Sequence, residues 1–474
     1  MNRLIVASNR VADPGGGAQS GGLAVGIGDA LRDLNGLWFG WNGETVAEEA
    51  GTGMHLERRS GVAVATQPLT REEYECYYLG YSNRALWPVL HYRLDLAQFD
   101  TKAFTVYREV NRRFARALAA LIQPGDVVWI HDYHLIPLGA ELRAVGITNR
   151  LGFFLHIPFP PPELISALPD HEWLIDTLFA CDVIGFQTDQ DLENFRRYLE
   201  QTEDRKTPEV CPYRCSGRSP LIRTYPIGID VDAFAAMANT QEAQERIRRL
   251  ARETPRTHII GVDRLDYSKG LPDRFRAFQR FLERYPEHRK QAVLMQIAPP
   301  TREELSAYSD IRTELERLSG AINGAYGDFD WTPVRYIHRL VSRDTLAALF
   351  RGSQIGLVTP LRDGMNLVAK EYIAAQDPED PGVLVLSQFA GAAADLREAI
   401  IVNPYDADEV AQSLHQALTM PAGERRERHA ALLQRIRDRD AANWRRQFLE
   451  DLRGDAAEAS PRQGRREPGP QVQA

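Results

Sequence analysis

The sequence is poor in cysteine, in long apolar runs and in net positive charge. Its 474 residues include four cysteines, too few for a disulfide framework, so a reducing compartment such as the cytoplasm is expected. No apolar run reaches the length that a membrane crossing requires, and the short apolar segment MNRLIVASNR predicts a first strand, not a signal peptide. The net charge of -8, with no basic stripe before the tail, argues against a nucleic-acid partner and leaves no reason to expect a membrane partner.

Two of the cysteines lie close together, Cys211 and Cys215, on either side of a loop that contains Pro212. They could be half of a metal site, but no second pair of Cys or His residues has matching spacing. A plain loop is therefore favoured. The remaining composition, with 43% hydrophobic residues, is that of a globular protein with a sizeable core and two or three domains.

Apolar segments of strand length alternate with helical patterns, and this alternation runs through the chain twice. It predicts an α/β fold with two Rossmann-like, doubly wound domains that face each other across a deep cleft. The expected division is an N-terminal domain over 1–227, a C-terminal domain over 228–440, a helix over 441–456 that crosses back to the first domain, and a disordered Pro- and Gly-rich tail over 457–474.

The expected strands share short, buried-type apolar runs: Leu4–Ser8, Leu37–Trp41, Asp126–Ile130, Leu151–His156, Val183–Phe186, Ile259–Val262, Ala292–Ile297, Val334–Ile337, Gln354–Thr359 and Val383–Ser387. The expected helices share apolar positions at helical spacing: Leu23–Leu34, Glu109–Leu121, Gln241–Arg252, Asp273–Tyr285, a helix beginning at Leu367, Ala411–Leu418 and Arg425–Leu449.

Polar residues follow several strands of the first series: Arg10, Asp132, His156 and Gln187. Open α/β sheets bind ligands at the carboxyl ends of their strands. Any one of these side chains could be a satisfied core or capping group. Four of them at equivalent positions predict one side of a cleft.

The segment LVTPLRDGMNLVAKE, Leu357 to Glu371, predicts a strand, a turn at Pro360 and a helix capped by Asn366. The free N–H groups and the dipole of such a helix N-terminus favour an anion. Asp363 in the turn then suits the hydroxyls of a ligand whose phosphate meets the amides, as in a sugar nucleotide. The alternative is a plain turn at Asp363 and Gly364 followed by a solvated Glu371.

A second strand-turn-helix unit carries the motif VDRLDYSKG, in which Arg264 and Lys269 follow a strand. Two cations in one turn suit a diphosphate; the alternative is a pair of surface salt bridges. Near the N-terminus, Gly21 and Gly22 would let a phosphate or a sugar approach backbone amides closely. There the alternative is a flexible surface loop.

These motifs resemble those of the trehalose-6-phosphate synthases, the retaining glycosyltransferases of family 20 with the GT-B fold. The resemblance covers nearly the whole chain, from about Asn2 to about Leu452. It implies transfer of glucose from a nucleoside diphosphate glucose, usually UDP-glucose, to glucose 6-phosphate, which gives α,α-trehalose 6-phosphate. The motifs that carry it are SNR, GGL, LWFGW, LWP, WIHDYHL, FFLHIPFP, YPIGID, RLDYSKG, LVTPLRDGMNLVAKEY and LSQFAGAA.

The resemblance also implies roles for individual residues. The catalytic set would be Arg264, Lys269, Asp132, His156 and Asp363. The donor site would comprise Gly21, Gly22, Arg264, Lys269, Val341, Asp363, Gly364, Met365, Asn366, Leu367, Val368, Ala369, Lys370 and Glu371. The acceptor site would comprise Arg10, Tyr78, Asp132 and Arg302, with Trp87 and His156 selecting the anomer.

No metal or other cofactor is expected. A metal-dependent transferase would show a D-x-D pair for its cation, whereas Asp263 and Asp266 have different spacing and are expected to face Arg264 and Lys269. The family is thought to retain configuration by same-face attack, so Asp132 is assigned to acceptor hydroxyls. His156 would hydrogen-bond the donor sugar, or is simply a satisfied histidine at a strand end.

Two other function classes compete with this interpretation. The first is another GT-B enzyme, such as a glycogen synthase or a phosphorylase. A polymer acceptor would not need Arg10 and Arg302 for a sugar phosphate, and a phosphorylase would need a lysine for pyridoxal phosphate, which nothing in the sequence marks. An inactive sensor or scaffold subunit commonly loses the cations and acids of the cleft, which are present here. The expected partners are the two small-molecule substrates, further copies of the chain in a dimer or tetramer, and a separate trehalose-6-phosphate phosphatase that acts downstream. UDP, GDP and ADP all remain open as the donor nucleotide.

Overall fold

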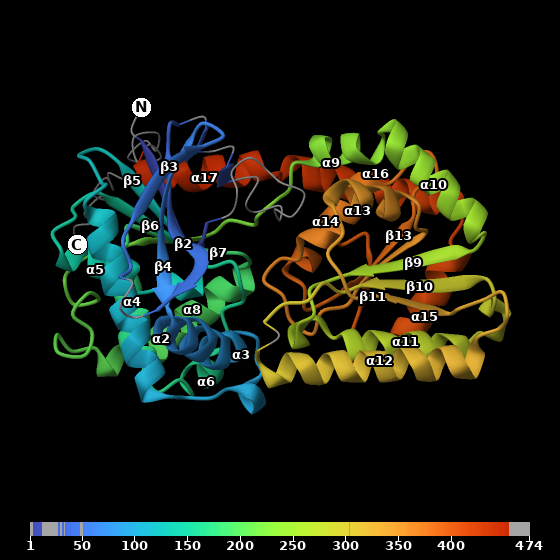
Figure 1. Ribbon diagram of the computed structural model, residues 1–474, viewed down its shortest axis with the longest axis horizontal. Helices are drawn as coiled ribbons and strands as arrows, with labels where there is room; N and C mark the ends of the chain where they lie inside the picture. The colour runs from blue at the N-terminus through green and yellow to red at the C-terminus, as the bar shows by residue number, and fades with distance from the viewer. Residues whose placement is uncertain are drawn as a thin grey trace, which may run out of the picture.

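The computed structural model has two α/β lobes that lie side by side, each built around one sheet with helices on both faces (Figure 1). The structure describes residues 3–11, 27–28, 31–32, 34–47, 51–302 and 304–454. The predicted glycine loop with Gly21 and Gly22 and the predicted disordered tail lie outside these residues. The predicted helix Leu23–Leu34 is described only at 27–28 and 31–32, where the backbone is helical.

Eight strands form the sheet of the first lobe, in the order β3-β4-β2-β1-β5-β6-β7-β8. Only β3 is antiparallel to its neighbour among these strands. The chain order reverses between β1 and β5, which makes their carboxyl ends the expected ligand position. The strands are β1 (Leu4–Arg10), β2 (Leu37–Val46), β3 (His55–Arg59), β4 (Val62–Thr70), β5 (Val127–His131), β6 (Arg150–Phe154), β7 (Val183–Phe186) and β8 (Leu221–Thr224).

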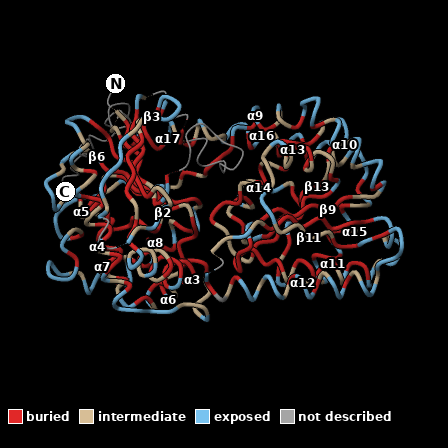
Figure 2. The backbone as a smooth tube through the Cα atoms, viewed as in Figure 1, coloured by how far each residue is buried: buried red, intermediate tan, exposed pale blue. Residues whose placement is uncertain are grey.

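Six parallel strands form the sheet of the second lobe, in the order β11-β10-β9-β12-β13-β14. Here the chain order reverses between β9 and β12, at a second switch point. Strands covered on both faces are buried along their whole length, as Figure 2 shows for the centre of each lobe. The strands are β9 (Thr257–Val262), β10 (Ala292–Ile297), β11 (Val334–Ile337), β12 (Ile355–Val358), β13 (Val383–Ser387) and β14 (Ile400–Val402).

The helices of the first lobe include a π-helical segment that the sequence did not predict. The buried tyrosines Tyr77 and Tyr81 of this segment lie 5.8 and 4.7 Å, between ring centroids, from Tyr107 of the adjacent helix α4. Wide π turns are rare and often occur at functional sites. The helices are α2 (Arg71–Glu73), η2 (Tyr74–Leu86), α3 (Trp87–Leu90), η3 (Leu94–Leu96), α4 (Thr101–Ala119), η4 (Tyr133–Leu135), α5 (Leu138–Ala144), α6 (Pro162–Ile165), α7 (His171–Leu178), α8 (Asp189–Gln201) and η5 (Glu203–Arg205).

The helices of the second lobe correct one prediction: the single helix expected over Arg425–Leu449 is two helices. The break lies at Asp440, whose side chain accepts a hydrogen bond from the backbone N–H of Asn443 at 2.7 Å and so caps α17. The helices are α9 (Val231–Ala238), α10 (Gln241–Glu253), η6 (Tyr267–Lys269), α11 (Leu271–Arg284), η7 (Pro286–His288), α12 (Ser306–Tyr326), α13 (Arg343–Arg351), α14 (Leu367–Ala375), η8 (Gly391–Ala394), α15 (Ala407–Thr419), α16 (Ala422–Asp438) and α17 (Ala441–Arg453).

Helix α17 runs from the second lobe back across the first one (Figure 1). Its Phe448 stacks on Trp129 of β5 with 4.6 Å between ring centroids. The same ring fills the space above two glycines, because a Cβ at Gly152 or Gly185 would lie 2.8 or 2.9 Å from it. At the end of the helix, buried Asp451 accepts a hydrogen bond from the hydroxyl of Tyr225 at 2.7 Å. Helix α17, the last helix of the described residues, therefore completes the core of the first lobe.

Among the described residues, no helix combines the length and the apolar character that a membrane crossing requires. Cys211 is buried and Cys215 is exposed, both as free thiols in a turn region, in agreement with the loop predicted there.

We expect Phe448→Ala to destabilise the protein by about 3–5 kcal/mol, because it opens a cavity between α17 and the first sheet. Urea unfolding followed by circular dichroism measures this. The control is Arg446→Ala on the exposed side of the same helix, which should stay within about 0.5 kcal/mol of the parent. Equal effects of the two substitutions would contradict the packing role of Phe448.

Candidate active site at the domain junction

The predicted site residues lie at the two switch points, which face each other across the junction between the lobes. Arg10 ends β1, and Asp132 directly follows β5. From the other lobe, Arg264 follows β9 and Asp363 follows β12. Each sheet therefore presents one cation and one carboxylate at the edge where α/β folds bind ligands.

Lys269 and Asp363 form an ion pair at the N-terminus of α14. The ammonium nitrogen of Lys269 lies 2.5 Å from Asp363 Oδ2, and their side chains are only 11% and 15% exposed. The side-chain amide of Asn366 donates to the same carboxylate oxygen at 3.0 Å. Asn366 also accepts the backbone N–H of Ala369 at 3.1 Å, which confirms it as the predicted cap of α14.

Gly364 lies directly against the backbone of the first lobe. A Cβ at this position would lie 2.2 Å from the backbone carbonyl oxygen of His156. On its other side, the carbonyl oxygen of Gly364 would lie 1.9 Å from a Cβ at Gly391. Any side chain at Gly364 would therefore push the turn that carries Asp363 away from the first lobe.

Arg302 comes from the second lobe and reaches a tyrosine of the first. Its guanidinium donates to the hydroxyl of Tyr133 at 3.0 Å and to that of Tyr308 at 2.7 Å. The same group lies 4.1 Å from the ring centroid of Trp87 and 3.5 Å from Asp266. Arg302 thus stacks on an aromatic ring of the first lobe while it holds a buried carboxylate of the second.

Asp266 is fully buried among cations. Burial alone would raise the pKa of its carboxyl, but Arg302, Arg264 and Lys269 hold this pKa below its ordinary value. The carboxylate stays ionised and offsets part of the positive charge behind the site. Asp263 was predicted to face Arg264 and Lys269; the charge of Lys269 does act on its carboxyl, but its ion pair is with a different cation. It forms a buried pair at 2.6 Å with Arg274 of α11, because its side chain turns into the core of the second lobe.

Arg10 and Arg264 are exposed cations beside aromatic rings. The guanidinium of Arg10 lies 5.8 Å from the ring centroid of Trp41, and that of Arg264 lies 5.9 Å from that of Trp87. Neither guanidinium has a hydrogen bond or an ion pair to a residue that the structure describes. Both are therefore available to an anionic ligand.

Tyr78, on the π-helix η2, packs between Trp41 and His134, with centroid distances of 5.4 and 5.9 Å.

Asp132 and His156 are joined by a hydrogen bond to the backbone of the histidine. Asp132 adopts φ 74°, an unusual conformation for aspartate, and accepts the backbone N–H of His156 at 3.2 Å. Burial raises the pKa of Asp132 to about 6, against the opposing effect of these backbone hydrogen bonds and of Arg264 and Arg302. Asp132 is therefore ionised at pH 7, close to two arginines of the other lobe.

His156 is held by a second histidine that the sequence analysis did not single out. His131 Nδ1 lies 2.9 Å from His156 Nε2, and the rings are stacked with 5.1 Å between centroids. Burial lowers the pKa of His156 to about 3 and lowers the pKa of His131 as well. At neutral pH the pair carries no charge, so His156 is a neutral hydrogen-bonding group and not a cation.

The remaining predicted donor residues lie on or near α14. Arg343 lies 3.6 Å from Glu371, whose pKa burial raises to about 7. Val341, just before α13, packs against the core of the second lobe. Along α14 the side chains of Leu367 and Val368 are partly buried, and those of Met365 and Ala369 are buried. Contacts of these residues with a ligand would therefore come mainly through their backbone.

Two predicted site residues have side chains that hydrogen-bond the backbone of Ile227, where the chain passes from the first lobe to the second. The Lys370 ammonium is buried and donates to the carbonyl of Ile227 at 2.7 Å, and burial lowers its pKa to about 8. Gln187, 2% exposed, accepts the backbone N–H of the same Ile227 at 3.1 Å. Its amide also donates to the carbonyl of His156 at 3.4 Å, and Gln187 lines a hollow together with Met365 and Gly391 of the second lobe, in agreement with its predicted place at the junction.

Tyr133, Tyr308 and His131 were missed because their roles depend on partners far away in the sequence. Tyr133 and His131 lie inside the motif WIHDYHL, which could have drawn attention to them. Tyr308, within the long helix α12, carries no comparable local signal. Arg274 was missed for the same reason, since only the turn of α11 onto β9 brings it to Asp263.

Two facing doubly wound lobes with anion-binding groups at both switch points define a two-domain glycosyl-transfer fold, the GT-B class. The family model for glycosyltransferase family 20 matches residues 15–454. The chain belongs to this family, as the motifs predicted.

Relatives and solved structures are similar to this chain over nearly its full length. A trehalose-6-phosphate synthase from Citrobacter koseri is 48% identical over 453 residues, which are 96% of this chain and 95% of the relative. An alpha,alpha-trehalose-phosphate synthase (UDP-forming) from Burkholderia xenovorans, solved in complex with glucose-6-phosphate, has a TM-score of 0.90 and 47% identity. It covers 96% of this chain and 100% of its own. An E. coli trehalose-6-phosphate structure bound with UDP-2-fluoro glucose has a TM-score of 0.88 and 45% identity, and covers 95% and 99%. The predicted two-domain α/β fold is confirmed.

We expect Asp132→Asn to stabilise the protein at pH 7 while it impairs activity. The folded protein raises the pKa of this carboxyl from 3.8 to about 6, so the folded state binds the proton more tightly than the unfolded state. Stability of the parent therefore falls as pH rises from about 4 to about 6. The Asp132→Asn variant does not lose stability in this way. Its free energy of unfolding should exceed that of the parent by up to about 3 kcal/mol at pH 7 and differ little from it at pH 4.

Denaturant unfolding of both proteins between pH 4 and pH 8 tests this expectation. A parent that gains stability relative to the variant as pH rises would contradict the assignment.

Proposed function

We propose that the groups at this junction catalyse the trehalose-6-phosphate synthase reaction. The enzyme transfers glucose from UDP-glucose to glucose 6-phosphate with retention and releases UDP and α,α-trehalose 6-phosphate, the first step of trehalose biosynthesis. The observation that carries the proposal is the pairing of two anion sites across one junction. Lys269 with the N-terminus of α14 lies on one side; on the other, Arg10 ends β1, and Arg302 lies close enough to Asp132 for its charge to act on that carboxyl.

The second lobe holds the donor in this proposal. Arg264 and Lys269 bind the diphosphate, and the N-terminal amides of α14 add the partial positive charge of a helix end. Asp363, fixed by Lys269 and Asn366, accepts hydroxyls of the donor glucose. Glu371, further along α14 beside Arg343, accepts the ribose hydroxyls. Gly21 and Gly22, which lie outside the described residues, approach the donor from the first lobe.

The first lobe holds most of the acceptor. Arg10 and Arg302 bind the phosphate of glucose 6-phosphate, and Tyr78 lines the same side. Asp132 accepts the acceptor hydroxyls. Its pKa of about 6 leaves the carboxylate ionised at neutral pH, which suits a hydrogen-bond acceptor. Trp87, stacked under Arg302, and the neutral His156 line the meeting point of the two sugars and select the anomer.

The reaction needs charge stabilisation more than proton transfer by the protein. As the glycosidic bond to the diphosphate breaks, negative charge develops on the leaving oxygen, and Arg264 and Lys269 stabilise it. The acceptor hydroxyl attacks from the same face and passes its proton to the departing oxygen. No covalent intermediate with Asp132 is needed. Because two side-chain cations and a helix end meet the diphosphate charge, we propose that turnover needs no metal.

In the cell, we propose that the enzyme acts in the cytoplasm as a homo-oligomer, a tetramer or a dimer. A separate phosphatase removes the phosphate from its product. The resulting trehalose serves osmoprotection and the response to stress. The small number of free cysteines supports a reducing compartment.

The decisive experiment mixes the protein with glucose 6-phosphate and UDP-, GDP- or ADP-glucose in turn, in excess chelator, and measures release of the nucleoside diphosphate. We expect the highest rate with UDP-glucose and no rate when unphosphorylated glucose replaces the acceptor. Equal rates with glucose would contradict the phosphate sites. A strict dependence on added metal would contradict the proposed chemistry.

Two arginine substitutions should separate the two substrate sites. Arg302→Ala should raise the KM for glucose 6-phosphate and lower kcat/KM by roughly 10- to 150-fold, the value of a hydrogen bond to a charged group, while donor binding is spared. Arg264→Ala should instead lower kcat by about 100- to 1000-fold, because it removes a group that stabilises the leaving diphosphate.

Initial-rate kinetics with each substrate varied, together with circular dichroism of each variant, measures these effects. The control is Arg276→Ala, a half-exposed arginine of α11 that pairs with Asp273 and Glu314, and it should change neither constant. An unchanged KM for glucose 6-phosphate in a folded Arg302 variant would overturn the acceptor assignment.

A further inference from the structure

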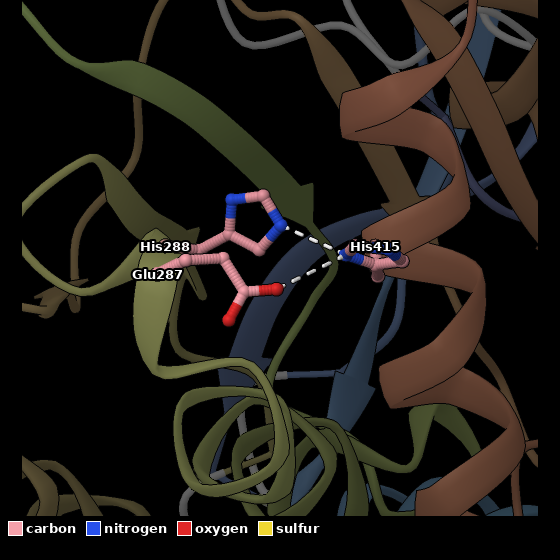
Figure 3. Close-up of side chains that lie close together, drawn as sticks. All are labelled: Glu287, His288 and His415. Atoms are coloured by element: carbon pink, nitrogen blue, oxygen red, sulfur yellow. Dashed lines mark hydrogen bonds and ion pairs between the residues drawn. The ribbon is translucent and has the colours of Figure 1, made fainter.

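Three metal-ligating side chains meet on the second lobe at a distance from the active site: Glu287, His288 and His415 (Figure 3). The first two belong to η7 and the short connection after α11, and His415 lies on α15. Helix α11 begins at the carboxyl edge of β9, which faces the domain junction, and its 14 residues span about 21 Å. The cluster therefore lies at the opposite edge of the sheet from the substrate groups.

The ligand atoms of the cluster already converge. His288 Nε2 lies 2.9 Å from His415 Nδ1, and a carboxylate oxygen of Glu287 lies 3.8 Å from that same nitrogen. All three ligand atoms fall within 4.8 Å of one another. Figure 3 shows both the imidazole of His288 and the carboxylate of Glu287 directed at the ring of His415.

Aromatic neighbours stack on both imidazoles and restrict the planes of their rings. The ring of His415 is parallel to Tyr285, with 4.3 Å between centroids and 5° between planes. The ring of His288 stacks on Phe281 at 5.3 Å and 16°. Two ligands 127 residues apart in sequence are thus positioned by packing before any ion binds, which lowers the entropy that a metal must overcome to order them.

The ligand set is that of a zinc site. Two imidazole nitrogens and one carboxylate oxygen suit a borderline metal ion and leave the remaining position to water. At Zn–N distances of about 2.0–2.1 Å, tetrahedral ligands are roughly 3.3 Å apart. The observed 2.9 Å between nitrogens needs only small side-chain rotations. Such rotations are open to His415 and Glu287, whose side chains are 34% and 57% exposed.

We propose that Glu287, His288 and His415 bind one Zn²⁺ ion that ties the end of α11 to α15. The two helices pack on the same sheet and against each other over much of their length. A metal bridge at their far ends would hold the second lobe more tightly without touching the substrate groups. The proposal is independent of the reaction at the domain junction.

The test uses the full-length protein carrying Cys215→Ser, which removes an exposed thiol that could also bind zinc. The protein is stripped with chelator, dialysed, and titrated with ZnCl₂ by calorimetry and with CoCl₂ by visible absorption. We expect one equivalent of each metal, a cobalt spectrum of low coordination number, and a rise in Tm with zinc. His288→Ala and His415→Ala should each lose the equivalent and the Tm rise, and Glu287→Gln should weaken binding.

The matched control is His55→Ala, which removes the histidine of an exposed His55–Glu57 pair whose groups lie 3.8 Å apart. This variant should keep the full equivalent, and zinc should leave the rate of glucosyl transfer unchanged in the parent. The proposal is overturned if the parent binds no stoichiometric metal. It is also overturned if both histidine variants, folded by circular dichroism, retain the equivalent.

Discussion

The ion pair between Lys269 and Asp363 is the interaction on which the geometry of the junction depends. It joins the ends of β9 and β12, the two strands that flank the switch point of the second sheet. Asn366 binds the same carboxylate and caps α14, so the pair also sets the direction of the helix end that points at the ligand. A free lysine at this position would be a mobile charge, whereas the pair gives it a fixed place beside a helix N-terminus.

The charged side chains at the junction differ in how far they are buried and in whether they are paired. The outer cations, Arg10 and Arg264, are exposed and form no direct ion pair with a described residue, although the charge of Arg264 acts on the carboxyls of Asp132 and Asp266. The inner ones are compensated, since Lys269 pairs with Asp363 and Arg302 with the buried Asp266. Removing the compensation would leave uncompensated buried charges, which are strongly destabilising. The exposed arginines therefore leave excess positive charge at the outer part of the junction, and the compensated pairs keep the packed interior near neutrality.

Much of the fold could be predicted because strands covered on both faces have continuous apolar runs. The strands Val183–Phe186, Ala292–Ile297, Val334–Ile337 and Val383–Ser387 have the predicted bounds. The edge strand β3, with the sequence HLERR, has no such run, since only β4 pairs with it and its side chains are largely exposed. The π-helix η2 follows no periodicity that sequence analysis uses. The single helix expected over Arg425–Leu449 missed the cap at Asp440.

For the site, the sequence located the turns but not the contacts between them. Arg264, Lys269 and Asp363 stand in local strand-turn-helix units, so their position at a sheet edge follows from the neighbouring residues. The contact of Arg302 with Tyr133 joins residues 169 apart in different lobes. It depends on how the lobes meet, and no local pattern records that. Asp263 shows the opposite error. It stands next to Arg264 in the sequence, but its ion pair is with Arg274 inside the core.

The path of α17 has a consequence for the order in which the protein matures on the ribosome. The first sheet is synthesised early, yet Phe448 of the later helix α17 packs over Gly152 and Gly185 and fills part of the space that these glycines leave. Domains generally fold in order as they are synthesised. The first lobe therefore keeps part of an apolar face uncovered until the segment that forms α17 has been synthesised. Translation of the second lobe thus becomes a step in the folding of the first.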